Sequence, residues 1–313
     1  MRIFNDLDAI GEIQNPVVTI GTFDGVHLGH QKILQTLRDE AKSVQGESVL
    51  LTFYPHPRMV LFPESHGMKL LQTQVEKIEK LEKNGLQNIV IYPFSFEFSR
   101  LTALEFVRDI LVNKLHVRKI VIGYDHQFGK NREGSIAYLK DIAETYEFEV
   151  IEIPAQDIDE VNVSSTKIRE ALLQGDVQRA NMFLGEPYQL SGTVIRGRAL
   201  GRTIGFPTAN IEVNSNIKLI PGIGVYAVEV LIHGQVYRGM LNIGLRPTVV
   251  STDVVNLEVH ILDFQQDIYD KNITVRFIER VRDEQKFESV EALKEQLKND
   301  EKVVRTSTLF GAK

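Results

Sequence analysis

The feature that most constrains the fold is a change of hydrophobic period just after Gly185 and Pro187. Before that point, from about residue 17 to residue 154, five short β-rich runs alternate with segments of helical period. The runs are VVTIGTF, SVLLTFY, NIVIYPF, KIVIGYD and FEVIEIP. Because strands that alternate with helices form parallel sheets, this part predicts a parallel sheet covered by helices.

Downstream of Pro187 the strand-rich runs follow one another directly, separated by Gly, Asn and Asp. They read YQLSGTVIRG, GVYAVEVLIHG, VYRGMLNIG, NLEVHILDF and ITVRFIERV. We therefore predict two domains, residues 1–185 and 186–313. The length of 313 residues favours this division over a single domain, since domains contain roughly 100 to 200 residues.

Three helices are distinct in the sequence. The first carries an apolar stripe at three- and four-residue spacing, formed by Ile33, Leu34, Leu37, Ala41 and Val44. A second, over Val75–Lys83, is followed by Gly85 as a candidate C-terminal cap. The chain ends in a helix with Ser289 as a candidate N-cap, and we expect it to pack on the β domain through Val290, Leu293 and Leu297.

Composition excludes several classes of protein. Hydrophobic residues at 43% and charged residues at 25% are typical of a folded globular chain. The absence of cysteine excludes disulfides, thiolate nucleophiles and cysteine-ligated metals. A net charge of -6 argues against nucleic-acid binding, and no apolar run approaches the roughly 18 residues of a membrane span, so we expect a cytoplasmic protein.

The segment GTFDGVHLGHQ follows the first strand and opens the first helix, which places His27 and His30 at the carboxyl edge of the sheet. Phosphates bind at such edges, held by backbone N–H groups and the helix dipole. Gly21, Phe23 and Gly29 are the further phosphate-binding candidates here, and Gly29 permits close approach of a nucleotide. The alternative is that the two histidines cap the helix or bind a metal.

A second polar segment, SSTKIRE, lies near the end of the same domain. It offers hydroxyls and backbone amides from Ser164, Ser165 and Thr166 at a helix start, while Lys167 and Arg169 add cations suited to phosphate. The plain alternative is an N-cap.

The third polar segment, GRALGRTIGFPTANI, lies in the β domain. Its glycines, Gly197, Gly201 and Gly205, let backbone N–H groups turn toward a phosphate chain, and Arg198 and Arg202 are basic. The oxygen atoms of Thr208 and Asn210 are suitable magnesium ligands. A turn with solvated charges is the alternative reading of the same glycines and arginines.

These motifs carry a family resemblance. The His-x-Gly-His turn with SSTKIRE is similar to a nucleotidyltransferase superfamily, whereas FPTAN resembles the hallmark of riboflavin kinases. PGIGVYAV, LNIGLRPT, NLEVHILDF and VRDEQKF match that kinase family in order, and the chain has no P-loop motif. Together the two halves resemble the bifunctional bacterial riboflavin kinase/FAD synthetase family over nearly the whole chain.

That resemblance implies a Rossmann-like α/β nucleotidyltransferase domain with a parallel sheet, then a six-stranded antiparallel β-barrel with a terminal helix. It implies that the barrel phosphorylates riboflavin to FMN and that the N-terminal domain adenylates FMN to FAD with release of pyrophosphate. Mg²⁺ and the co-substrate ATP are expected in both reactions. The partners would be these small molecules, without nucleic acid or membrane, and the protein a monomer or weak homo-oligomer.

The resemblance also assigns residues. Glu258 would be the base that accepts the ribityl hydroxyl proton, because an alcohol profits from a base. The alternative for Glu258 is an outward-facing strand residue. Arg282, Glu284 and Phe287 would close over the flavin, with plain packing as the alternative. The N-terminal flavin pocket would use aromatic and neighbouring residues that also suit a core, namely Phe53, His56, Pro57, Phe62 and Phe128.

One loop departs from the family pattern. Tyr124, Asp125 and His126 follow Gly123, where family members more often have Glu-Asp-Phe. The departure concerns FMN contacts and leaves the phosphate-handling residues in place.

Adenylyl transfer needs no base, because the attacking phosphate oxygen is already anionic at neutral pH. Three rival functions remain: catalysis by the barrel alone, a flavin-binding regulator or carrier, and a nucleic-acid-binding barrel. Retention of His27, His30, Ser165 and Arg169 argues against the first. Retention of Thr208, Asn210 and Glu258 argues against the second, while the acidic charge and lack of tryptophan argue against the third.

Overall fold

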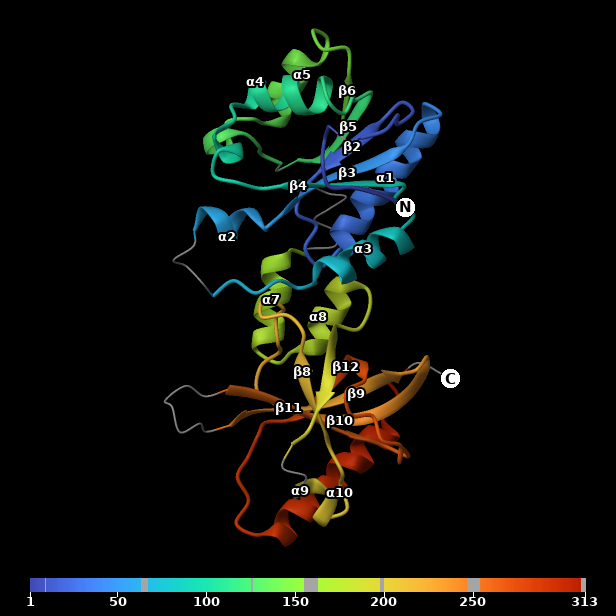
Figure 1. Cartoon of the computed structure of the whole chain (residues 1–313), viewed down its shortest axis with the longest axis vertical. Helices are drawn as coiled ribbons and strands as arrows, with labels where there is room; N and C mark the ends of the chain where they lie inside the picture. Colours follow the sequence, from blue (N-terminus) through green and yellow to red (C-terminus); the bar gives the residue numbers. More distant parts are fainter. Residues whose placement is uncertain are drawn as a thin grey trace. The chain divides into compact units, whose positions relative to one another are not determined.

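A computed structural model describes residues 1–8, 10–62, 67–124, 126–154, 163–197, 200–246 and 254–310 (Figure 1). The chain forms two compact units, Met1–Ser164 and Ser165–Lys313. Two short helices, α7 (Ser165–Leu173) and α8 (Val177–Leu184), therefore belong to the second unit by their contacts. The functional boundary at 185/186 stays a prediction.

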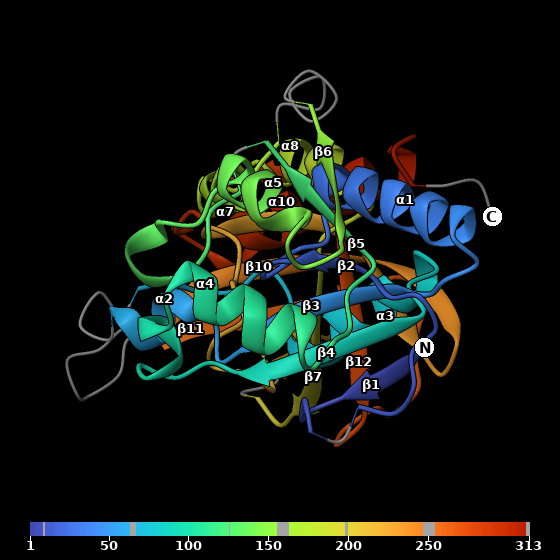
Figure 2. The same ribbon diagram turned by 90° about the horizontal axis from the view of Figure 1, so that it is seen from above.

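Unit 1 contains a six-stranded parallel sheet in the order β1-β4-β3-β2-β5-β6. Figure 2 shows the strands in this order, from β1 at one edge to β6 at the other. Their bounds are β1 Arg2–Phe4, β2 Val17–Ile20, β3 Ser48–Tyr54, β4 Asn88–Pro93, β5 Lys119–Gly123 and β6 Glu149–Ile153. The parallel sheet and its strands β2 to β6 confirm the prediction, whereas the three-residue β1 was missed.

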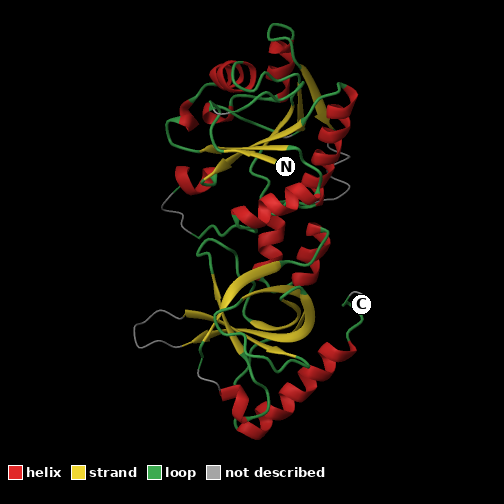
Figure 3. Cartoon of the chain, turned by 45° about the vertical axis from the view of Figure 1, so that its right-hand side comes forward, coloured by secondary structure: helices red, strands yellow, loops and turns green. Residues whose placement is uncertain are grey.

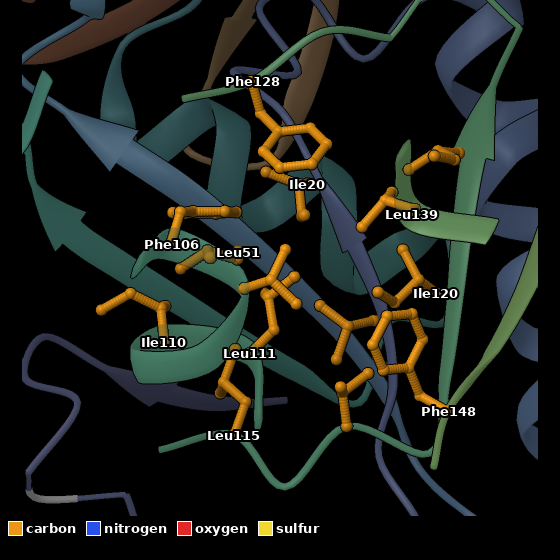
Figure 4. Packing of buried hydrophobic residues seen from close by; sticks show 14 of the residues in the cluster. Ile20, Leu51, Phe106, Ile110, Leu111, Leu115, Ile120, Phe128, Leu139 and Phe148 are labelled. Atoms are coloured by element: carbon orange, nitrogen blue, oxygen red, sulfur yellow. The ribbon is translucent and has the colours of Figure 1, made fainter. Parts of the chain in front are cut away.

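Helices cover both faces of this sheet, α1 and α3 on one and α4 and α5 on the other (Figure 1). Strand residues of opposite parity supply the two cores: Leu50 packs toward α1 and α3, whereas Leu51 packs on the other side (Figure 4). The helical bounds are α1 Leu28–Ser43, α2 Pro57–Leu61, α3 Gln74–Lys83, α4 Ala103–Glu105, a π-helical turn Phe106–Val112, α5 Ile136–Ala143 and 3₁₀ turns Phe98–Arg100 and Lys130–Arg132.

The two helices predicted in this unit are confirmed. In α1 the predicted stripe faces the sheet, with Leu34 and Leu37 fully buried. Helix α3 begins with a capping box between Thr73 and Glu76 and is followed by Gly85 at φ +75°, a left-handed conformation that favours glycine.

Unit 2 contains a closed antiparallel barrel in the order β10-β11-β8-β7-β12-β9 (Figure 3). The strands are β7 Gln189–Ile195, β8 Ala209–Val213, β9 Gly224–Ile232, β10 Gln235–Arg246, β11 Val254–Ile261 and β12 Asn272–Arg282. Five of them are the predicted β runs. The sixth, β8, completes the six strands that the resemblance implies, but it begins inside FPTAN, where no β run was predicted.

Two helices complete the barrel unit, the short α9 (Leu200–Thr203) and the terminal α10 (Val290–Thr306). Ser289 caps α10 as predicted, because its side chain accepts a hydrogen bond from the N–H of Ala292 at 3.1 Å. Val304 and Leu297 pack against barrel residues, while Val290 is 56% exposed and lies outside the contact. Within the described residues, no helix combines the length and apolar character needed to cross a membrane.

Candidate active sites

The first candidate site lies at the carboxyl end of β2, which pairs with β3 on one side and β5 on the other. The chain runs outward from β2 through β3 to β4 and later returns to β5 on the opposite side of β2. Such a reversal of strand order opens a crevice where α/β sheets bind ligands. The His-x-Gly-His turn therefore follows the strand at the switch point.

The backbone of this turn is strained. Phe23, Gly25 and Val26 all have positive φ, at +49°, +88° and +38°. This is an uncommon conformation for phenylalanine and an outlier for a β-branched valine, and such strain persists only where surrounding contacts impose it. Gly21 lies so close to the Phe23 ring that a Cβ atom there would be 3.0 Å from the ring.

The two predicted histidines come together on this turn. His27 caps α1, since its Nδ1 accepts a hydrogen bond from the backbone N–H of His30 at 3.3 Å. Their rings stack with centroids 3.7 Å apart, and Phe23 stacks on His30 at 4.5 Å. A Cβ at Gly29 would meet the His27 ring at 3.3 Å, so glycine permits this packing. Helix capping and the predicted phosphate role are thus compatible for His27.

His30 is held neutral by its surroundings. Burial is the largest cause that lowers its pKa well below the usual histidine value, and the charges of His27, Lys80 and Lys77 add to it. Its buried Nδ1 has no hydrogen-bond partner within the described part of the chain.

Three charged residues of this region were not predicted: Asp24 lies within the turn itself, and Lys77 and Lys80 of α3 contact its backbone carbonyl groups. The carboxylate of Asp24 accepts hydrogen bonds from the backbone N–H groups of Leu71 at 3.0 Å and Gln72 at 3.3 Å. Lys77 and Lys80 of α3 are buried, each 7% exposed. Because lysines on an amphipathic helix normally face water, no pattern in the sequence indicated that these two are buried.

The predicted SSTKIRE residues fall at the junction of the two units. Ser164 is the last residue of unit 1, and Ser165, Thr166, Lys167 and Arg169 lie at the start of α7 in unit 2. Their joint action with the histidines stays a prediction.

The candidate flavin residues of unit 1 have different environments. Phe128 is 8% exposed within the sheet core, where its ring packs on Phe106 at 5.5 Å, and Phe53 packs on Phe98 at 5.6 Å. Phe62, in contrast, is 60% exposed at the end of α2.

The start of α2 and the departing loop complete this group. His56 caps α2, its Nδ1 accepting from the Arg58 N–H at 3.2 Å, and Pro57 is the first helical residue. In the loop that departs from the family pattern, Tyr124 is 42% exposed and Asp125 lies outside the described residues.

The second candidate site is centred on Glu258 of β11. Its strand neighbours are Asn210 on β8 and Asn242 on β10, which lie directly opposite it in the two ladders. Thr208 Oγ1 donates to one carboxylate oxygen at 3.3 Å, and Asn256 Nδ2 donates to the other at 2.6 Å. Neutral donors therefore orient both oxygen atoms of Glu258, on the face of β11 opposite to the buried Leu257 and Val259. Its role as a base stays a prediction.

A cavity of about 300 Å³ opens over this carboxylate. It brings together the residues predicted for the kinase flavin pocket, since its lining includes Thr208, Glu258, Arg282, Glu284 and Phe287. A second cavity, of about 530 Å³, is lined by Arg202, Pro207 and Thr208 from the glycine-rich segment and by residues 264–269. Thr208 lines both cavities, which are therefore adjacent.

Glycines shape the loop between the cavities. A side chain at Gly197 would overlap the Asn210 amide, and one at Gly201 would overlap the Phe206 carbonyl, so close packing requires glycine at both. Gly205 has φ +88°. Arg198 lies outside the described residues.

Several residues that support the barrel site were missed. Asn256 and His260 lie two residues to either side of Glu258, so strand alternation places all three on one face. His260 Nδ1 lies 2.7 Å from the Pro207 carbonyl oxygen, a contact that ties FPTAN to β11. Buried Asp300 of α10 forms a two-pronged ion pair with Arg282, with its shortest contact at 2.8 Å. Strand alternation from Glu258 could have predicted Asn256 and His260, whereas no sequence pattern pointed to Asp300.

The donor atoms at the barrel site suit magnesium. Thr208, Asn210 and Glu258 offer hydroxyl, amide and carboxylate oxygens, the ligand types that Mg²⁺ prefers, and Mg²⁺ normally takes only one or two protein ligands beside substrate phosphates and water. The residues present therefore fit the ion.

Comparison with known proteins gives consistent matches to both halves. Residues 10–167 match the family model described as FAD synthetase, and residues 184–308 match the one described as riboflavin kinase. A bifunctional riboflavin kinase/FMN adenylyltransferase of Listeria monocytogenes is 40% identical over 93% of this chain and 92% of its own length. One from Haemophilus influenzae is 40% identical over 95% of both.

A solved structure matches the whole fold. The crystal structure of a Streptococcus pneumoniae protein, described as a macrolide-efflux protein, has a TM-score of 0.89 with this chain at 35% identity. The match covers 98% of this chain and 99% of that one.

Proposed function

This chain belongs to the family of bifunctional riboflavin kinases/FMN adenylyltransferases, and we propose on that premise how its two sites divide the work. The barrel makes FMN from riboflavin and ATP, and the N-terminal sheet makes FAD from FMN and ATP. The observation that carries the assignment is the placement of Glu258 with Thr208 in a cavity beside a second, nucleotide-sized cavity.

In the barrel, the Glu258 carboxylate accepts the proton of the terminal ribityl hydroxyl. The hydroxyl oxygen forms a bond to the γ-phosphorus of ATP as the bond between that phosphorus and the β,γ-bridging oxygen breaks, giving FMN and ADP. The hydrogen bonds from Thr208 and Asn256 fix the carboxylate for this transfer. The cavity over Glu258 would hold the flavin, with Arg282, Glu284 and Phe287 in its wall, and the adjoining cavity with Arg202 would hold ATP.

Thr208 and Asn210 would hold Mg²⁺, and the ion supplies charge neutralisation for the phosphates when bound. Gly197, Gly201 and Gly205 keep the loop close to these side chains. His260 fixes the position of Pro207 and therefore of the adjacent Thr208.

In unit 1, a phosphate oxygen of FMN attacks the α-phosphorus of ATP, and pyrophosphate leaves as FAD forms. No proton has to be removed, so the site needs position and positive or donor groups. His27 and His30, with Gly21, Phe23 and Gly29, would hold the phosphates at the helix start, and Ser164, Ser165, Thr166 and Arg169 would complete the set. Phe53, His56, Pro57, Phe62 and Phe128 are the proposed flavin-side residues.

We also infer that the protein acts on small molecules in the cytoplasm as a monomer or weak homo-oligomer. The lack of cysteine and the use of ATP support the cytoplasmic location, and the acidic charge supports small molecules rather than nucleic acid as partners. Light scattering after size exclusion, with and without flavin and Mg-ATP, would measure the oligomeric state.

The function is tested by incubating the purified chain with riboflavin and Mg-ATP and separating the flavins over time. FMN should rise first and then fall as FAD accumulates. FMN alone would show that unit 1 does not adenylate it, and unchanged riboflavin with intact ATP would favour a flavin-binding protein.

A further inference from the structure

Two buried ammonium groups support the strained turn of unit 1 from below. Lys77 Nζ donates to the Thr22 carbonyl at 3.3 Å and to Thr52 Oγ1 at 3.2 Å, and Lys80 Nζ donates to the Gly25 carbonyl at 3.2 Å. These carbonyls bracket the segment in which Phe23 has positive φ. Both lysines belong to α3, which packs on the sheet face that α1 also covers.

The same segment has one further fixed point. The Asp24 carboxylate is tied to the backbone N–H groups of Leu71 and Gln72. Two cations thus hold carbonyl groups of the turn, and the carboxylate of the turn's own Asp24 binds the backbone of a neighbouring loop. Since a strained backbone persists only where its surroundings impose it, these contacts account for the placement of the Phe23 ring against His30.

Burying two lysines is costly, which argues against a simple packing role. An ion removed from water loses several kcal/mol of solvation unless hydrogen bonds and countercharge replace it. Apolar side chains would fill the same space between α3 and the sheet without that cost. These charges donate to carbonyl groups of the turn that we propose to bind phosphate, which supplies a functional reason for their burial.

We propose that Lys77 and Lys80 are positioning residues for adenylyl transfer, which hold the phosphate-binding turn in its strained form and place positive charge beneath His27 and His30. The inference rests on the proposed function of unit 1. The lysines act through the turn: they shape the backbone that carries the imidazoles, and their charge, little screened in a buried site, favours an anion at the turn.

The charge of Lys77 makes the reaction sensitive to pH. Burial lowers its pKa to about 8, opposed by the attraction of Asp24. The other titratable groups around the turn are Lys80, His27 and His30, with Glu76 on the same helix as Lys77. Because the ammonium form is the one that donates and carries charge, FAD formation should decline above about pH 8.

The experiment compares Lys77→Met, Lys80→Met and Lys77→Arg with Lys83→Met, an exposed position on the same helix. Each protein is assayed from pH 6.5 to 9.5 for FAD from FMN and, separately, for FMN from riboflavin. Lys77→Met and Lys80→Met should lower kcat for FAD formation about tenfold or more while kinase rates stay unchanged. The decline above pH 8 should disappear in Lys77→Met and move to higher pH in Lys77→Arg.

A second readout needs no substrate. The pKa of His30, followed by NMR of labelled imidazoles and assigned with a His30→Asn variant, should rise in both methionine variants and stay unchanged in Lys83→Met. Far-UV circular dichroism identifies any variant that fails to fold, and the remaining variants then carry the test. Wild-type kcat, wild-type pH profile and unchanged His30 pKa in folded methionine variants would overturn the proposal.

The experiments distinguish a failure of the proposed function of unit 1 from a failure of the proposed role of Lys77 and Lys80. If the wild-type chain makes no FAD from FMN, the proposed function of unit 1 is wrong. If it makes FAD and the folded methionine variants do so equally well, only the role of the lysines is wrong.

Discussion

The two candidate sites differ in the kind of residues that form them. In unit 1 a strained turn after β2 carries two stacked imidazoles, and its charged supports are the buried Lys77, Lys80 and Asp24. In unit 2 the barrel sets one carboxylate, Glu258, among neutral donors on adjacent strands. The difference fits the nucleophiles proposed for the two sites, because an FMN phosphate is already anionic whereas a ribityl hydroxyl must lose a proton.

The largest effect is expected at the barrel carboxylate. Glu258→Gln keeps the shape but removes the base, and general bases contribute roughly 10²- to 10⁴-fold, so FMN formation should fall by about 10³. FAD formation from supplied FMN should stay at the wild-type rate. The exposed Glu212→Gln on β8 is the control and should leave both rates intact. Equal loss of both activities in folded Glu258→Gln would break the comparison.

The converse variant is His30→Asn. It removes the ring that stacks on His27 and Phe23, and we expect FAD formation to fall about 10²-fold, in the range found when one stabilising group is deleted from an active site. Kinase activity should not change. His116→Asn, an exposed histidine of the same unit, serves as the matched control. A normal rate of adenylation would remove His30 from the site.

The buried charge of unit 1 should also appear in stability. The folded pKa of Lys77, about 8, lies below its ordinary value of 10.5, so between these values the unfolded chain binds the extra proton. Stability relative to Lys77→Met should therefore rise with pH, by about 2 kcal/mol from pH 7 to 9.5. Urea unfolding of both proteins across this range measures the difference, and a constant difference would show that Lys77 does not titrate in this range.

A smaller effect is expected at His260. His260→Phe keeps the edge contact with Phe206 but loses the contact with the Pro207 carbonyl, so Thr208 is less well placed. We expect kinase kcat/KM to fall about tenfold, because a tenfold change corresponds to about the free energy that one hydrogen bond contributes. Adenylation should be unaffected. A wild-type kinase rate would show that FPTAN holds its position without this contact.

Much of the fold could be predicted because it depends on hydrophobic period. The runs that became β2 to β6 and five barrel strands have the length and pattern of buried strands, and the stripe of α1 is regular. β1 was missed because three residues give no period. β8 was missed because its pairing with β7 and β11, which no local pattern encodes, turns part of FPTAN into a strand.

The candidate site residues could be named from the sequence only where they lie in short motifs. His27, His30, Thr208, Asn210 and Glu258 all lie in such motifs. Lys77 and Lys80 were not found, because a lysine on a surface helix normally faces water and only the packing of α3 shows otherwise. Phe128 shows the opposite difficulty. It was predicted as a flavin contact, but an aromatic residue in a loop can equally fill a core, and the Phe128 ring packs in the sheet core.

The most direct test of two separate sites is complementation between Glu258→Gln and His30→Asn. Each variant alone is given riboflavin and Mg-ATP, and then the two are mixed in one vessel. The account predicts no flavin product from the first, FMN that accumulates with little FAD from the second, and FAD from the mixture, because FMN made by one protein is adenylated by the other. A mixture that stops at FMN, although Glu258→Gln adenylates added FMN, would contradict the claim that free FMN links two independent sites.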